Sequence, residues 1–245
     1  MRPLKSYFIC FTVRSGSTLL SQLLADTGIA GQPKERFYHN IAPENPRGDV
    51  IPDYRAYLKR VLAADTSPNG VFGSKVGGGY WNDFARRLRA IDGFADLPLM
   101  SALDRLFPDL RYLHLTRRNK ARQAVSHWLA IQTGRWSSLD AVNSPEPRYD
   151  FAAIDHLLQE IIMREAVWAE HFSENGIRPF VITYEDFVER PAATVCAVLD
   201  YLEIERPAGF HAPAPRYQRI SDARSEEWVQ RFRRDKQRDF WTQFW

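Results

Sequence analysis

Residues 5–18 read KSYFICFTVRSGST, and this stretch decides the fold class. The apolar run from Lys5 to Val13 predicts a buried β-strand, and leucines at helical spacing predict a helix from Thr18 to about Thr27. Between them, Arg14-Ser15-Gly16-Ser17 forms a turn in which glycine permits a sharp change of direction. A strand that turns through glycine into a helix is typical of a parallel α/β unit.

Further strands and helices alternate along the chain. Strands are predicted at Val71–Val76, Leu110–Leu115 and Pro179–Thr183. Helices are predicted after Pro191 and at Asn119–Gln132, Phe151–Glu174 and Ser225–Phe244. Ser225 is the expected cap of the last helix. The alternation predicts an α/β fold with a P-loop-like central parallel sheet flanked by helices. Two segments rich in Pro, Asn and Gly are predicted to be loops that cover a site: Gln32–Asp53 and Gly134–Pro147.

Length and composition favour one globular domain over residues 1–245. The chain has 245 residues, of which 44% are apolar, and no run approaches the roughly 20 apolar residues of a membrane span. The basic N-terminus imitates a signal peptide, but its apolar run leads into Arg14 without a small-residue cleavage site. Cys10 and Cys196 make neither a disulfide framework nor a metal cluster, so a cytoplasmic location is expected. A net charge of +3 argues against a protein that coats nucleic acid.

The turn Arg14–Thr18 is a predicted anion-binding loop. After a strand-to-helix turn, free backbone N–H groups and the positive end of the helix dipole converge on a spot that suits phosphate or sulfate. Arg14 adds a charged fork, and Ser17 and Thr18 add hydroxyl groups. An ordinary turn with a helix cap is the alternative interpretation. GxxxxGK[ST] is absent and the loop has no lysine, which disfavours a nucleoside triphosphate with magnesium. A sulfuryl group carries less charge, so arginine and N–H donors suffice for its transfer without a metal.

A second anion site is predicted after the strand Leu110–Leu115. One helical face there begins at the strand end, beside the first loop, and carries Asn119, Arg122, Gln123 and Ser126. Arg117, Arg118 and Ser126 are the candidate ligands for another phosphate. In the alternative interpretation, Ser126 bonds back within its own helix and the arginines are solvated.

Three motifs occur in order along the chain: RSGSTLL at residues 14–20, TRRNKARQAVSHWLAIQTG at residues 116–134 and ITYEDFVERPAATVCAVLDYLEI at residues 182–204. With GQPKERF, GVFGSK and RSEEWVQRFRRD, they resemble the sulfotransferases that use PAPS (3′-phosphoadenosine 5′-phosphosulfate). The resemblance is closest to the bacterial trehalose 2-sulfotransferase-like family and spans nearly the whole chain. It implies the sulfotransferase fold, PAPS as sulfuryl donor, PAP as product, no metal and a homodimer.

The resemblance also implies roles for the matching residues. The cradle for the 5′-phosphosulfate comprises Arg14, Ser15, Gly16, Ser17 and Thr18. Arg117 and Ser126 match the pair that binds the 3′-phosphate, and Arg118 competes with Arg117 because subfamilies differ in this spacing. Tyr184 matches the tyrosine beside the adenine, and Arg219 matches a late arginine near the 3′-phosphate.

Glu35 matches the catalytic base of the family. An acceptor hydroxyl loses its proton as its oxygen attacks sulfur, and a carboxylate within hydrogen-bond reach can take that proton. Arg14 is the second catalytic candidate, because it would stabilise charge that develops on the sulfuryl and bridging oxygens. Lys75 and His39 are further candidates. The alternative for Glu35, Lys75 and His39 is an exposed surface role.

The expected acceptor is a small molecule with a hydroxyl group, either a carbohydrate or a glycolipid. Val13 and Gln32 stand where the trehalose enzymes have polar or acidic residues, which argues against trehalose itself. Aromatic residues that would either stack on a sugar or belong to the core are Phe37, Tyr38, Tyr80, Trp81 and Trp136. Three other functions stay open. They are a P-loop phosphotransferase, a sulfotransferase-like scaffold that acts only as a structural partner, and a non-catalytic module that binds nucleotides or nucleic acid through residues 231–239, RFRRDKQRD.

Overall fold

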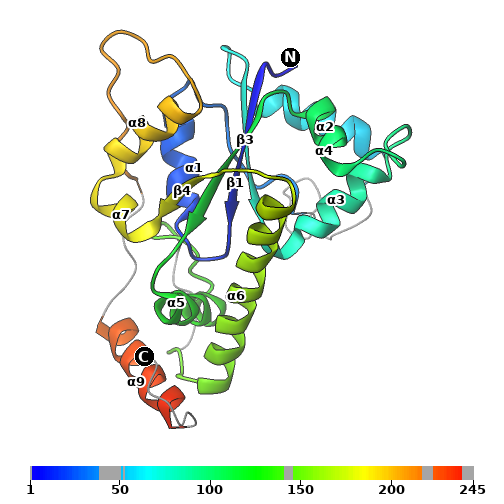
Figure 1. The fold of residues 1–245 in the computed structure, drawn as a ribbon. Coiled ribbons are helices and arrows are strands. Elements are labelled where there is room, and N and C mark those ends of the chain that lie inside the picture. Colours follow the sequence, from blue (N-terminus) through cyan, green and yellow to red (C-terminus); the bar gives the residue numbers. More distant parts are fainter. Residues whose placement is uncertain (1, 39–50, 52, 141–145, 217–222, 239–245) are drawn as a thin grey trace.

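The computed structural model describes residues 2–38, 51, 53–140, 146–216 and 223–238. A parallel sheet with the strand order β2-β1-β3-β4 forms its centre (Figure 1). The strands are β1 (Lys5–Phe11), β2 (Val71–Gly77), β3 (Leu110–Thr116) and β4 (Phe180–Thr183). Neighbouring strands all pair in parallel, which confirms the predicted α/β class and each predicted strand.

Strand β1 lies inside the sheet and is buried on both faces. Tyr7 and Ile9 point into one apolar cluster, whereas Phe8 and Cys10 point into the other. A parallel strand covered by helices on both faces needs such a continuous apolar run, because neither face meets water. The Phe8 ring is fully buried and makes edge-to-face contacts with several aromatic rings around it.

Helices cover both faces of the sheet (Figure 1). One face packs against α1 (Ser17–Asp26), α7 (Tyr184–Glu189) and α8 (Pro191–Tyr201). The other packs against α2 (Tyr54–Asp65), α3 (Trp81–Arg89), α4 (Leu99–Leu106) and α6 (Phe151–Glu174), with the short helix η1 (Gly78–Tyr80) after β2. A third apolar cluster joins α6 to α5 (Lys120–Thr133) and α9 (Ala223–Gln237). No helix in these described ranges is long and apolar enough to cross a membrane.

Most predicted boundaries agree within a few residues, and α6 agrees at both ends. The predicted cap at Ser225 is wrong, because α9 begins at Ala223 and Ser225 is a buried residue of its first turn. Strand β1 ends at Phe11, so Thr12 and Val13 belong to the loop. The predicted end of the last helix at Phe244 and much of the loop Gln32–Asp53 lie outside the described residues.

Candidate active site

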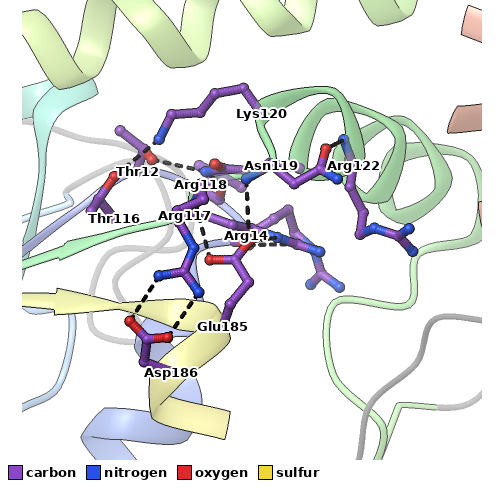
Figure 2. A network of polar contacts seen from close by, with 12 residues as sticks. Thr12, Arg14, Thr116, Arg117, Arg118, Asn119, Lys120, Arg122, Glu185 and Asp186 are labelled. Atoms are coloured by element: carbon purple, nitrogen blue, oxygen red, sulfur yellow. Dashed lines mark hydrogen bonds and ion pairs between the residues drawn. The ribbon is translucent and has the colours of Figure 1, made fainter. Parts of the chain in front are cut away.

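The sheet register brings three loop segments to one edge. Phe11 of β1 pairs with Leu115 of β3, and Thr116 of β3 pairs with Thr183 of β4. Because these parallel strands end at the same level, the residues that follow them lie side by side. Residues 12–16, 117–119 and 184–186 therefore form one polar cluster at the carboxyl edge of the sheet (Figure 2).

The loop between β1 and α1 has the backbone of an anion cradle. Arg14 and Gly16 both have positive φ, at 65° and 92°. The Ser15 amide bonds to the Thr12 carbonyl at 3.2 Å, which tightens the turn before α1 begins at Ser17. No acidic side chain lies in the first turn of α1, so the positive end of that helix is available to an anion.

Arg14 connects the two predicted anion sites. Its Nε donates to Ser126 Oγ on α5 at 3.1 Å, and its Nη1 donates to the Trp136 carbonyl. Burial lowers the pKa of Arg14, while the nearby Tyr184 and Asp140 act in the opposite direction. The contact joins the loop after β1 to the helix after β3, which is the arrangement that two neighbouring anion sites require. Ser126 Oγ is the acceptor in this bond, so its hydroxyl hydrogen can still be donated to an anion.

Gln123 on α5 fixes the anion loop through two hydrogen bonds. This fully buried side chain donates to Thr12 Oγ1 at 2.9 Å and to the Val13 carbonyl at 2.7 Å. The sequence placed Gln123 on the polar face of its helix but gave it no role in the site. Its position three residues before Ser126 on that face was the available signal.

Arg117 and Tyr184 close the loop on its other side. Arg117 is only 6% exposed, its Nη1 donates to the Arg14 carbonyl at 3.3 Å, and its guanidinium lies 4.6 Å from the centre of the Tyr184 ring. The same ring lies against Gly16, where a Cβ would sit 2.6 Å from Tyr184 Cδ2. Glycine is therefore required at residue 16 both for its backbone and for the approach of this ring.

Arg118 points away from the anion loop (Figure 2). It is exposed and forms a bidentate pair with Asp186, with both N–O distances at 2.8 Å. The structure thus separates the two competing arginines: Arg117 is buried beside the loop, and Arg118 is paired at the surface. Arg219 lies outside the described residues.

Glu35 is held at the end of β2 by its own segment. The Lys34 carbonyl accepts from the Lys75 amide at 3.0 Å, and Arg36 forms a bidentate pair with the buried Asp65 at 2.7 and 3.0 Å. Phe37 is fully buried in the core and stacks on Phe84. Contacts on both sides of Glu35 therefore restrict where its side chain can point.

The Glu35 carboxylate contacts Lys75 and Tyr80. Lys75 Nζ lies 3.3 Å from Oε2, and the Tyr80 hydroxyl lies 3.2 Å from Oε1. Burial and the neighbouring carboxylate raise the pKa of Tyr80, which keeps its hydroxyl protonated and able to donate. Lys75 Nζ also lies 5.3 Å from the ring of Phe11, the last residue of β1, which places this cluster at the edge that carries the anion loop.

The predicted aromatic residues divide between core and site. Phe37 and Trp81 are buried core residues. Tyr38 stacks on Tyr80 at 5.0 Å, and Trp136 is 47% exposed. His39 lies outside the described residues. Tyr38, Tyr80 and Trp136 thus remain the candidates for contact with an acceptor.

The donor groups at this edge suit an anion. Arginine side chains and backbone amides gather there, and among the described residues no group of three metal-binding side chains occurs. Such a set can hold phosphate and sulfuryl oxygens through N–H donors.

The fold is that of an α/β protein with a parallel central sheet, and a solved sulfotransferase shares it. The structure is similar to the crystal structure of a sulfotransferase from Alicyclobacillus acidocaldarius, with a TM-score of 0.53 and 15% identity over 95% of this chain and 91% of that one. The family model described as Stf0 sulphotransferase matches residues 6–235, and the chain belongs to this family. The family resemblance predicted from the sequence is confirmed.

Two relatives share this family at greater sequence similarity. The chain is 30% identical to proteins named trehalose 2-sulfotransferase from Mycolicibacterium smegmatis and from Mycobacterium tuberculosis. The alignments cover 96% of this chain and of the first relative, and 97% of this chain and of the second.

Proposed function

We propose that this protein transfers a sulfuryl group from PAPS to a hydroxyl group of a carbohydrate-type acceptor. The observation that carries the proposal is the hydrogen bond from Arg14 to Ser126, which joins the two predicted anion sites. A donor with phosphate groups at both ends of one nucleoside needs two such sites at a fixed separation.

The loop and its neighbours would hold the donor. We assign the 5′-phosphosulfate to the backbone and side chains of Arg14–Thr18, and the 3′-phosphate to Arg117 and Ser126. The buried position of Arg117 beside the loop favours it over Arg118, whose fork is already bonded to Asp186. Tyr184 is assigned to the adenine, and its ring position between Gly16 and Arg117 supports this.

Glu35 would act as the general base. The acceptor oxygen forms a bond to sulfur while the bond from sulfur to the phosphate oxygen breaks, and Glu35 takes the hydroxyl proton. Lys75 and Tyr80 would fix the carboxylate in place, and Arg14 would stabilise the negative charge on the departing phosphate oxygen.

The names of the two relatives support a sugar as the acceptor class. Val13 and Gln32 support an acceptor other than trehalose, since polar or acidic residues are expected there, Val13 has no hydrogen-bonding group and Gln32 carries no charge. Tyr38, Tyr80 and Trp136 are available to stack on a sugar ring. A homodimer, a cytoplasmic location and a single domain over residues 1–245 stay predictions.

The test is a turnover assay with labelled PAPS and a panel of sugars and glycolipids, with products identified by mass spectrometry. We expect Glu35→Gln to lower kcat by about 10²- to 10⁴-fold with PAP binding retained, the range for loss of a general base. Arg14→Ala should instead weaken PAP binding. Glu174→Gln, which neutralises an exposed carboxylate at the end of α6, is the matched control. Turnover of magnesium-ATP without turnover of PAPS would contradict the proposal.

A further inference from the structure

Glu185 holds the backbone at the start of α5. Its carboxylate accepts from the Arg118 amide at 3.0 Å and from the Asn119 amide at 3.2 Å (Figure 2). These amides precede the first turn of α5, where the helix itself offers no acceptor. The α7 side chain thereby fixes the chain on the carboxyl side of Arg117.

The same carboxylate faces the Arg117 guanidinium. Glu185 Oε1 lies 3.8 Å from Arg117 Nε, which is buried and has no hydrogen bond among the described residues. The Tyr184 ring covers one face of this guanidinium, and the Arg14 carbonyl accepts from its Nη1. Arg117 is thus held from three directions, with Glu185 on the Nε edge and the anion loop on the Nη edge.

Glu185 is suited to this role because it stays ionised. Burial alone would raise the pKa of Glu185, but the two backbone N–H bonds and the Arg117 charge outweigh burial and lower it. An ionised carboxylate on the Nε edge favours the guanidinium orientation that turns the Nη edge toward the loop.

We propose that Glu185 is a positioning residue that orients Arg117 toward the 3′-phosphate of the nucleotide. The inference rests on the proposed function and adds to it a residue that touches no part of the donor. Its neighbour Asp186 provides the matched control, because its carboxylate also faces an arginine, but that arginine is the exposed Arg118, which points away from the anion loop.

The experiment measures calorimetric affinities for PAP and for adenosine 5′-monophosphate, which lacks the 3′-phosphate. The ratio of the two affinities reports on the 3′-phosphate contact alone, since general damage to the site weakens both nucleotides together. We expect Glu185→Gln to reduce the ratio by about tenfold, by analogy with the lower end of the range for groups that orient metal-ligating side chains. Asp186→Asn should leave the ratio unchanged.

Each outcome decides between the two proposals. A wild-type protein without preference for PAP would refute the nucleotide assignment itself. If the wild-type protein prefers PAP and Glu185→Gln leaves that preference unchanged or increases it, only the role of Glu185 is refuted. An increase is the result expected when a negative charge near the phosphate is simply removed. If Glu185→Gln does not fold, Glu185→Asp retracts the carboxylate by one methylene and is expected to reduce the ratio as well. An unchanged ratio in that variant would refute the role.

Discussion

Replacement of Gly16 by alanine tests whether the anion loop and the Tyr184 ring act together. The new Cβ would lie 2.6 Å from Tyr184 Cδ2 and 3.0 Å from Cε2, well inside ordinary van der Waals contact. The ring must therefore move away from the loop by about 1 Å, given the usual contact distance between carbon atoms of roughly 3.5–4.0 Å. Because that ring lies 4.6 Å from the Arg117 guanidinium, the shift also disturbs the predicted 3′-phosphate ligand.

Gly28→Ala separates the backbone effect from this contact. Gly28 also has positive φ, at 72°, but a Cβ there meets no atom within 4 Å. Both variants should lose about 1 kcal/mol in the free energy of unfolding from the left-handed backbone. We expect only Gly16→Ala to lose PAP affinity, by about tenfold, because a displaced cation–π contact is worth roughly 0.5–2 kcal/mol.

Urea unfolding and calorimetric titration with PAP measure the two effects independently. Equal PAP affinity in the two variants would show that the ring position against Gly16 does not support nucleotide binding. The assignment of Tyr184 to the donor site would then be wrong.

Three further predictions concern the two neighbouring arginines, Tyr80 and the buried His171. Arg117→Ala should weaken PAP binding by about 10- to 100-fold, the scale of a hydrogen bond to a charged group. Arg118→Ala should change PAP binding by less than about twofold, because a surface ion pair contributes little. Equal losses of PAP affinity in calorimetry would contradict this prediction. Tyr80→Phe removes a hydroxyl from Glu35 and should lower kcat by about fivefold with PAP affinity unchanged, in steady-state kinetics and titration. Burial lowers the pKa of His171 to about 4, so the unfolded chain binds the proton first, and the contribution of this side chain to stability should fall by roughly 2 kcal/mol between pH 7 and pH 5. Urea unfolding of His171→Phe, which cannot titrate, should lack this share of the loss.

The strands were predictable because each is a short segment rich in apolar residues, and β1 and β2 also adjoin clear turn signals in the sequence. In β1 every residue from Ser6 to Phe11 is buried, which is the pattern that a central parallel strand requires. Helices α2, α3, α4 and α7 were not predicted. Helix α3 buries Trp81, Phe84 and Leu88, which stand at i, i+3 and i+7, so the sequence did carry the periodic signal of this helix.

The candidate site was predictable where residues follow strand ends, and less so elsewhere. Arg14, Arg117 and Tyr184 each come within a few residues of the end of a parallel strand, so their proximity follows from the topology. The spacing of residues along the sequence could not decide between Arg117 and Arg118. That choice depends on the position of Asp186 in the fold, where it pairs with Arg118. The contact of Tyr80 with Glu35 depends on an isolated parallel β-bridge between Lys34 and Ser74, which no local sequence pattern predicts.

The hydrogen bonds of Arg14 explain why this loop carries an arginine, although a lysine would supply the same charge. The planar fork sends Nε to Ser126 and Nη1 to the Trp136 carbonyl at once, which a single ammonium on a flexible stem cannot hold in fixed directions. The Arg14 backbone sits at φ 65°, a conformation that costs a non-glycine residue about 1–2 kcal/mol. That same conformation presents the Arg14 carbonyl to Arg117. One strained residue therefore sets the spacing between the two predicted anion sites through its side chain and its backbone together, and strain of this kind persists where surrounding contacts maintain it.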